Sequence, residues 1–405
     1  MSQNMGQTAH QSKMVQGQKS ALRVRKAFSM ETLIFLLAFV VFFAAIASKM
    51  GTVNMLNTLM NTAYALLMDT VLYIMAIAVL AGAISALFTE FGVVASINKL
   101  LSPLMRPLYG MPGASMVGIL TTYLSDNPAI LTLAEDDNFL HYFKKYQVPA
   151  LTNIGTAFGM GLIISTFMVG VGAVMNQNCF LAVLLGNLGA IIGSIVSTRL
   201  MLFFTKREFG IDAPALDAGT DSVCSLDSNS RTIRPGSASS RFMEAILEGG
   251  KSGVGMGVAI IPGVLIICSL VMLLSKGPGA EGLYTGAAYE GVAFLPWLGE
   301  KLQFVLGPLF GFTSAEAIAV PITALGAAGA AIGLVPQMAQ EGLVTQVDLA
   351  VFTAMCMCWS GYLSTHVAMM DSLHFRSLTG KAIFSHTIGG IAAGISANLL
   401  CQLIL

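Results

Sequence analysis

Apolar residues run almost without interruption through most of the chain, and polar residues gather in short segments between the runs. A single helix needs about 20 apolar residues to cross the hydrocarbon core of a bilayer. Seven runs reach or approach that length, namely 31–48, 67–88, 149–174, 179–203, 252–274, 348–371 and 382–404. The pattern therefore predicts an all-α polytopic membrane protein with about seven full spans.

Two further apolar segments, 113–135 and 314–335, are interrupted near their centres. The first contains "YLSDNPAIL" and the second contains "ALGAAGAAIG", with Gly326 and Gly329 near the middle. A helix of about twelve residues covers roughly 18 Å, which is about half of a ~30 Å hydrocarbon core. We therefore expect each segment to enter the membrane, turn and leave on the same side as a re-entrant helical hairpin.

The distribution of basic residues tests this topology, because Lys and Arg concentrate on the cytoplasmic side of membrane proteins. With the N-terminus inside, seven spans and two hairpins, 18 of the 21 basic residues lie inside, and only Lys49, Lys276 and Lys301 lie outside. If the interrupted segments were full crossings, Lys144, Lys145 and the polar loop 204–241 would lie outside as well. The charges favour the hairpins and predict a cytoplasmic N-terminus.

An internal repeat accompanies this pattern. At a constant offset of 201 residues, "PLYG" at 107–110 falls on "PLFG" at 308–311, and Thr122 falls on Thr323. Each repeat would hold three spans, an odd number, so the second copy would insert upside down. Inverted repeats with broken helices near the bilayer midplane recur among secondary transporters.

These observations divide the chain into five parts. They are a cytoplasmic tail (1–29), a first span with its connector (30–66), a first repeat (67–203), a cytoplasmic linker (204–241) and an inverted second repeat (242–405). The tail is polar and basic without a clear cleavage signature, so we expect the first span to be retained.

Composition supports a membrane protein and narrows the function. Hydrophobic residues make up 55% of the chain and charged residues only 10%, with a mean hydropathy of +0.76, whereas soluble domains carry about a quarter charged residues. The linker contains no nucleotide-binding pattern, and the chain shows no Ser/His/Asp or H-E-x-x-H constellation. We expect neither an ATP-driven pump nor an enzyme, and no metal site or cofactor.

The first hairpin tip, Ser125-Asp126-Asn127-Pro128, carries the most unusual polarity. An ionised Asp at the centre of a membrane costs at least ~2.5 kcal/mol on insertion scales, so such a residue is a functional candidate. We expect Asp126 to couple transport to Na⁺ or H⁺, and Ser125 and Asn127 to bind substrate. The alternative is that these residues only cap two helix ends, with Pro128 at the start of the second helix.

Two spans carry further polar residues, "PALTNIGTAFGMGLIIST" from residue 149 and "CMCWSGYLSTHVAMMD" from residue 356. Gly361 could mark a local unwinding, and His366 could relay protons or lie at the membrane interface. Close helix packing is the alternative explanation for the small polar residues. The substrate-binding candidates in these spans are Asn153, Thr156, Trp359, Ser360, Tyr362 and Ser364.

Outside these segments, Gly249, Gly253 and Gly257 leave one helix face smooth enough for a partner helix. Glu90, near the end of a predicted span, is expected to be solvated.

The stretch "EAILEGGKSGVGMGVAIIPGVLIICSLVMLL" (244–274) and the order of elements resemble the nucleoside-recognition, or Gate, domain. That domain occurs in concentrative nucleoside transporters, in the membrane part of ferrous-iron transporters and in spore-maturation membrane proteins. The resemblance covers about residues 67–404, and "CWSGYLST" (358–365) is loosely similar to a substrate-site helix of the nucleoside transporters. Their Gly-Gln-Thr-Glu hairpin and Asn-Glu-Phe motif are absent here.

The resemblance implies a symporter of the bacterial inner membrane that moves a nucleoside or another small polar metabolite, driven by Na⁺ or H⁺. The site would lie at the midplane, between the two hairpin tips and the two polar spans. The expected partners are the small-molecule substrate and the lipid bilayer, with no nucleic acid and with a homo-oligomer left open. The alternatives are a non-transporting membrane partner or assembly factor, as among spore-maturation proteins, and an ion or metal permease.

Overall fold

The computed structural model describes residues 27–134, 137–215, 233–279 and 282–405. These residues form α-helices with short 3-10 and π-helical segments, and no β-strand occurs within them. Almost all of the N-terminal tail and the middle of the predicted linker lie outside the described residues.

The chain forms two units, residues 1–52 and 53–405. The described part of the first unit is mainly helix α2 (Met30–Met50), which matches the predicted span 31–48. Ser29 begins this helix, because its side chain accepts a hydrogen bond from the backbone N–H of Thr32 at 3.3 Å. The helix is apolar all round, as expected of a membrane span.

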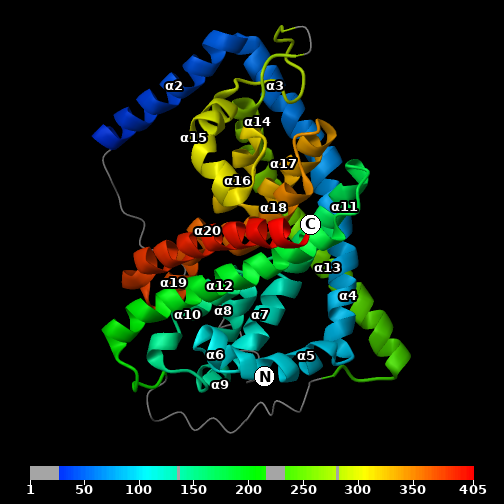
Figure 1. Ribbon diagram of the computed structural model, residues 1–405, viewed down its shortest axis with the longest axis vertical. Coiled ribbons are helices and arrows are strands. Elements are labelled where there is room, and N and C mark those ends of the chain that lie inside the picture. The colour runs from blue at the N-terminus through cyan, green and yellow to red at the C-terminus, as the bar shows by residue number, and fades with distance from the viewer. Residues whose placement is uncertain (1–26, 135–136, 216–232, 280–281) are drawn as a thin grey trace, which may run out of the picture. The chain divides into compact units, whose positions relative to one another are not determined.

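The second unit holds the remaining helices (Figure 1). Its first half comprises α3 (Thr52–Ala65), the π segment η1 (Leu66–Val71), α4 (Leu72–Glu90), α5 (Val93–Leu101), η2 (Ser102–Leu104), α6 (Met105–Tyr109), α7 (Ser115–Leu124), α8 (Pro128–Ala134), α9 (Asp137–Leu140), η3 (Lys145–Gln147), α10 (Ala150–Thr156), α11 (Gly161–Val174) and α12 (Phe180–Phe209). Its second half comprises α13 (Ala238–Gly263), the π segment η4 (Val264–Cys268), α14 (Ser269–Ser275), α15 (Phe294–Phe310), η5 (Ala315–Ile318), α16 (Ala319–Gly326), α17 (Ala328–Gln340), α18 (Gln346–Trp359), α19 (Tyr362–Ser372), η6 (Arg376–Leu378) and α20 (Thr379–Ile404).

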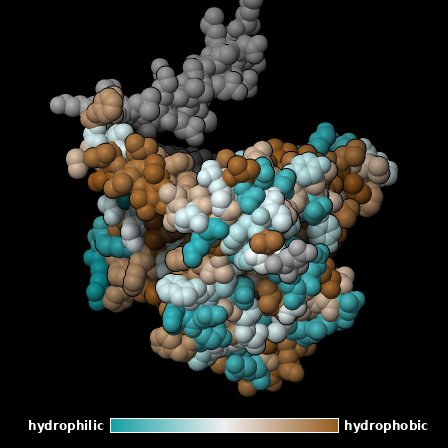
Figure 2. All heavy atoms as spheres, turned by 90° about the horizontal axis from the view of Figure 1, so that it is seen from above, coloured by the Kyte–Doolittle hydropathy of each residue, from teal (hydrophilic) through white to brown (hydrophobic). Residues whose placement is uncertain are grey.

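Length and apolarity identify the membrane spans. Within the described residues six helical segments are long and apolar enough to cross a membrane, or seven if α15 and α16, bent by 77° at their junction, form one span. Many large apolar side chains are exposed, as lipid contact requires, and brown apolar residues lie open on the face seen in Figure 2. The chain is an all-α polytopic membrane protein, as predicted.

The predicted span 348–371 is not one helix. It consists of α18 and α19, which are separated at Ser360 and Gly361. The predicted span 149–174 is likewise divided into α10 and α11 by a turn at residues 157–160. Apolar run length predicts that a segment is buried in the membrane, but it does not report whether the backbone stays helical.

Both predicted hairpins are present. The first hairpin turns at residues 125–127, between α7 and α8. Its two ends are joined where the side-chain amide of Gln147 donates to the carbonyl oxygen of Gly110 at 3.0 Å. That bond joins the chain before the first hairpin to the chain after it. The second hairpin turns at Ala327, and a Cβ added at Gly311 would lie 3.0 Å from a side-chain carbon of Val347. The two ends of each hairpin therefore lie together.

Helix α13 packs along α4 through the predicted glycine face. A Cβ at Gly249 would lie 2.3 Å from the carbonyl oxygen of Gly82, and one at Gly253 would lie 2.3 Å from that of Ala78. Only glycine permits this backbone approach. The expectation of a partner helix is confirmed, and the partner is α4.

Helices α12 and α20 lie side by side across the centre of the unit (Figure 1). Gly193 and Gly389 approach each other's backbone so closely that an added Cβ would lie 2.4–2.8 Å from a carbonyl oxygen.

The predicted linker 204–241 is helical at both of its ends. Helix α12 continues to Phe209, and helix α13 begins at Ala238. Polar helical turns beyond a span carry no hydropathy signal, which is why the linker boundaries differ.

The 201-residue offset recurs in the backbone. Gly110 ends α6 with a φ of 71°, and Gly311 ends α15 with a φ of 72°. Helix α11 begins after Met160 with a φ of 56°, and α19 begins after Gly361 with a φ of 67°. Equivalent left-handed residues at a constant spacing support the repeat read from the sequence.

Candidate functional site

The tip of the first hairpin is organised by the polar residues that interrupt the sequence. Helix α7 ends at Leu124, where the Ser125 hydroxyl donates to the carbonyl oxygen of Thr121 at 2.5 Å. The Asp126 carboxylate accepts a hydrogen bond from the backbone N–H of Asn127 at 2.7 Å. Pro128 then begins α8, a position that suits a residue without an N–H. The Ser125 hydroxyl therefore caps the end of α7, and a side-chain cap on the start of α8 stays a prediction.

Asn127 points from the tip into the protein. Its side chain is 2% exposed, and its amide nitrogen donates to the carbonyl oxygen of Ser360 at 2.7 Å. Its amide oxygen is buried and has no hydrogen-bond partner among the described residues. A buried amide oxygen without a partner costs about 1–3 kcal/mol, so a partner supplied by a ligand would be favourable.

The second polar span breaks where Asn127 meets it. Ser360 and Gly361 have φ values of 23° and 67°, which end α18 and allow α19 to start in a new register. The backbone N–H of Gly361 donates to the carbonyl oxygen of Ala324, near the end of α16, at 2.9 Å. This break therefore contacts both hairpin tips, and the unwinding expected at Gly361 is confirmed.

The first polar span breaks beside the same place. The Ser360 hydroxyl donates to the carbonyl oxygen of Gly159 at 3.4 Å, and these residues are 201 positions apart. A Cβ at Gly159 would lie 1.8 Å from the amide oxygen of Asn127. Four interruptions thus meet: the tips at 125–127 and 326–327, and the breaks at 157–160 and 360–361. Sequence reasoning missed the break at Met160, although the repeat offset places it opposite Gly361.

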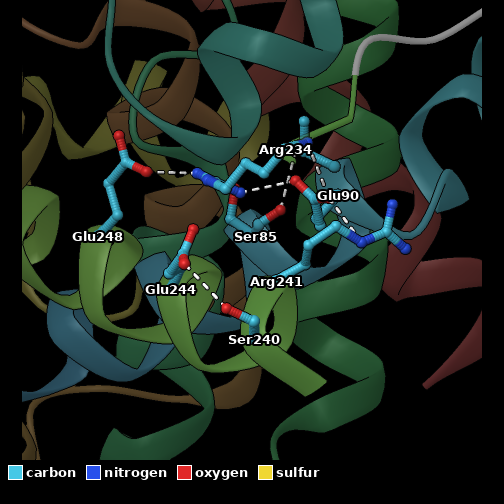
Figure 3. A network of polar contacts seen from close by, with 8 residues as sticks. Ser85, Glu90, Arg234, Ser240, Arg241, Glu244 and Glu248 are labelled. Atoms are coloured by element: carbon cyan, nitrogen blue, oxygen red, sulfur yellow. Dashed lines mark hydrogen bonds and ion pairs between the residues drawn. The ribbon is translucent and has the colours of Figure 1, made fainter. Parts of the chain in front are cut away.

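A cavity of about 260 Å³ lies beside the first tip. Leu124 and Ser125 of the first tip line it together with residues of α4 and α13. Arg234 and Glu248 also line it, and Arg234 pairs with both Glu248 and Glu90 (Figure 3). Glu90 was expected to be solvated, but it is buried, because Arg234 and Arg241 compensate its charge.

The other predicted site residues lie deeper in the helix packing. The Asn153 amide donates to the Ser197 hydroxyl and to the carbonyl oxygen of Ala382, both at 3.0 Å. Thr156 is buried, and its hydroxyl has no partner in the described part of the chain. Trp359 packs against Gly390. Asn153 therefore satisfies its amide donors within the protein, and a binding role for these residues stays a prediction.

A cluster of rings continues from Trp359 along α19. The Tyr362 hydroxyl shares a hydrogen bond of 2.6 Å with Thr387, and the ring of Tyr362 stacks on Trp359. His366 and His386 are fully buried with their ring centroids 4.6 Å apart, and both roles considered for His366 stay predictions. Ser364 lies in α19, but its side chain is outside the described features.

The described residues contain no group of three or more His, Cys, Asp or Glu side chains that could hold a metal ion. The tip instead offers carbonyl, amide and hydroxyl groups with one carboxylate. Such groups form hydrogen bonds to a small polar molecule and coordinate hard monovalent cations.

Solved structures of CNTnw, a concentrative nucleoside transporter, are similar to this chain. A double variant of CNTnw in an outward-facing state aligns with 83% of this chain and 76% of its own, at 14% sequence identity and a TM-score of 0.51. CNTnw in an inward-facing substrate-bound state aligns with 80% of this chain and 74% of its own, at 13% identity and a TM-score of 0.45. At these identities the similarity concerns the fold alone. No protein-family model matches the chain, and no curated protein matches its sequence.

Proposed function

We propose that the chain is a secondary transporter that moves a small polar metabolite, such as a nucleoside, across the bacterial inner membrane. The observation that carries this proposal is the meeting of four helix interruptions around Asn127, whose buried amide oxygen has no partner among the residues that the structure describes. Non-helical backbone at membrane depth is tolerated only where it is buried in protein or lines a watery cavity. The structural similarity to a nucleoside transporter supports the same class of function.

In this proposal substrate binds at the first tip and the two breaks, through Ser125, Asn127 and Ser360. Asp126 binds Na⁺ or takes up H⁺ as the coupling cation. Its carboxylate is partly buried and uses one of its oxygens on the backbone N–H of Asn127. The N-terminus lies in the cytoplasm, as the basic residues predict.

The test is solute flux into liposomes that contain the purified protein, driven by an imposed Na⁺ or H⁺ gradient. A thermal-shift screen of nucleosides, bases, amino acids and metal ions, with and without Na⁺, selects the solute. We expect Asp126→Asn to abolish gradient-driven uptake while the protein remains folded and inserted. Unchanged gradient-driven flux in this variant rules out the coupling role.

The runner-up is a membrane partner or assembly factor that does not transport. Absence of flux for every solute, together with a protein that co-purifies in stoichiometric amount, would favour it over a transporter.

A further inference from the structure

A second cavity, of about 720 Å³, lies between α7 of the first hairpin and helices α11 and α12, and residues of α5 and α6 complete its lining (Figure 1). We call it the lateral groove. Its volume falls within the ~300–1,000 Å³ of typical ligand pockets. Fifteen of its twenty lining residues are Leu, Ile, Val, Met or Phe. An occupant of the lateral groove must therefore be largely apolar.

The polar groups of the lateral groove are already engaged within the protein. The Tyr123 hydroxyl on α7 donates to the amide oxygen of Asn187 on α12 at 3.0 Å, and the amide nitrogen of Asn187 donates to the Ser165 hydroxyl on α11 at 2.9 Å. The Thr166 hydroxyl donates to a backbone carbonyl of its own helix at 2.8 Å, and the Tyr109 hydroxyl shares a hydrogen bond of 2.7 Å with a serine of α12. Because these groups have partners, the lining favours a hydrocarbon chain over a polar solute.

The lateral groove opens on the surface of a membrane-spanning helix. Phe180, Leu184, Leu188 and Ile191 line it from α12, and all four side chains are exposed. Their spacing of four, four and three residues places them on one face of that helix. Helix α12 is long and apolar enough to cross a membrane, so lipid chains rather than water surround its exposed face. A bilayer acyl chain therefore has direct access to the groove.

Basic side chains flank the lateral groove. Lys99 on α5 and Arg106 on α6 are each within two residues of a residue that lines it. Both are exposed, and neither forms an ion pair within the described part of the chain. The Arg199 guanidinium donates to the backbone carbonyl of Leu108, a lining residue, at 2.8 Å. Because basic groups beside membrane helices attract the headgroups of anionic lipids, these charges favour an anionic over a zwitterionic phospholipid.

We propose that the lateral groove binds an acyl chain of an anionic phospholipid, whose phosphate lies against Lys99 and Arg106. The acyl chain packs along α7, which ends at Leu124 directly before the first tip. The bound lipid therefore holds the first hairpin against α11 and α12. This lipid site is independent of the proposed transport function.

Photo-crosslinking in nanodiscs tests the site. The purified protein is reconstituted in phosphatidylcholine with the same small fraction of one of two probes that carry a diazirine on the acyl chain, either phosphatidylglycerol or phosphatidylcholine. After irradiation, mass spectrometry of peptides measures the labelling of 116–123 on α7 and of 180–191 on α12. The reference is the stretch 72–84 of α4, which exposes large apolar side chains outside the groove.

We expect the phosphatidylglycerol probe to label 116–123 and 180–191 at least fivefold more than the phosphatidylcholine probe does, with no such preference at 72–84. Replacing Leu184 with Trp should fill the groove and lower the labelling of 116–123 at least fivefold. Leu120→Trp tests the same point if Leu184→Trp does not fold. The matched control is Leu80→Trp, on the exposed surface of α4, which should leave this labelling unchanged.

The headgroup contact is tested separately. The double variant Lys99→Gln/Arg106→Gln should lose the preference for phosphatidylglycerol. The matched control is Lys206→Gln/Arg207→Gln, which removes the same charge from the last turn of α12 and should keep the preference.

Equal labelling of 116–123 by the two probes in the wild type would overturn the anionic lipid, and so would a preference that survives the loss of Lys99 and Arg106. If 116–123 and 180–191 remain unlabelled while 72–84 is labelled, protein such as a second copy of the chain excludes lipid from the groove, and the proposal is wrong. The labelling requires no flux, so neither result depends on whether the protein transports a solute.

Discussion

Replacing Gly159 with Ala should disrupt the junction of the four helix interruptions. The added Cβ would lie 1.8 Å from the amide oxygen of Asn127 and 2.6 Å from the Ser360 hydroxyl. Neither distance is tolerable, so the Asn127 side chain must move and lose its 2.7 Å hydrogen bond to Ser360. The lost bond contributes about 0.5–1.5 kcal/mol, and overpacking typically costs about 1–3 kcal/mol. The expected destabilisation is therefore roughly 2–4 kcal/mol.

Thermal unfolding of the purified protein measures this effect. With about 2 °C per kcal/mol, the lower end of the range for large domains, Gly159→Ala should melt roughly 4–8 °C below the wild type. The control is Gly380→Ala, because a Cβ at Gly380 would meet nothing within 4 Å. If Gly159→Ala melts with the wild type and the control, the close approach of Gly159 to Asn127 is not a feature of the folded protein.

Two further predictions concern packing and pH. Gly249→Leu would drive its side chain into the backbone of α4, so we expect this variant to aggregate after detergent extraction. The control Gly255→Leu should remain monodisperse, because a Cβ at Gly255 meets nothing within 4 Å. Equal yields of monodisperse protein from the two variants would contradict the packing of α13 on α4. Burial raises the pKa of Glu290, but hydrogen bonds from Thr285 and Gly286 outweigh it and hold this pKa below its ordinary 4.5. The carboxylate therefore stabilises the loop between α14 and α15 above pH 4.5, and this stabilisation is lost as the pH falls through the lowered pKa. Hydrogen exchange of the loop should show that loss in the wild type and not in Glu290→Gln; the same pH profile in both would refute it.

The positions of the two hairpins could be predicted because their cause is local. In the first hairpin Asp-Asn-Pro follows a short apolar run and cannot continue a membrane helix at low cost, and in the second Gly326 lies at the interruption. The basic residues favour a return to the same side of the membrane. The break at Gly361 was also foreseeable, since glycine adopts a positive φ without strain. Met160 gives no such signal, because non-glycine residues rarely take that conformation, and only the repeat offset points to it.

Interactions between distant segments could not be read from the sequence. Glu90 is buried because Arg234, 144 residues later in the chain, pairs with it. Asn153 is a polar residue in an apolar span, and sequence alone cannot distinguish a cavity lining from hydrogen bonds to Ser197 and Ala382. Apolar patterning specifies which segments enter the membrane, whereas the pairing of polar groups inside it depends on the tertiary fold.

The most direct test of a solute site at the first hairpin tip is binding and counterflow with Asn127→Leu. This variant has a similar side-chain size but no amide. With the solute selected by the thermal-shift screen, we expect the wild type to catalyse counterflow in liposomes. The counterflow rate of the folded variant should be at least tenfold lower. A folded Asn127→Leu protein that binds and exchanges the solute like the wild type would contradict the account.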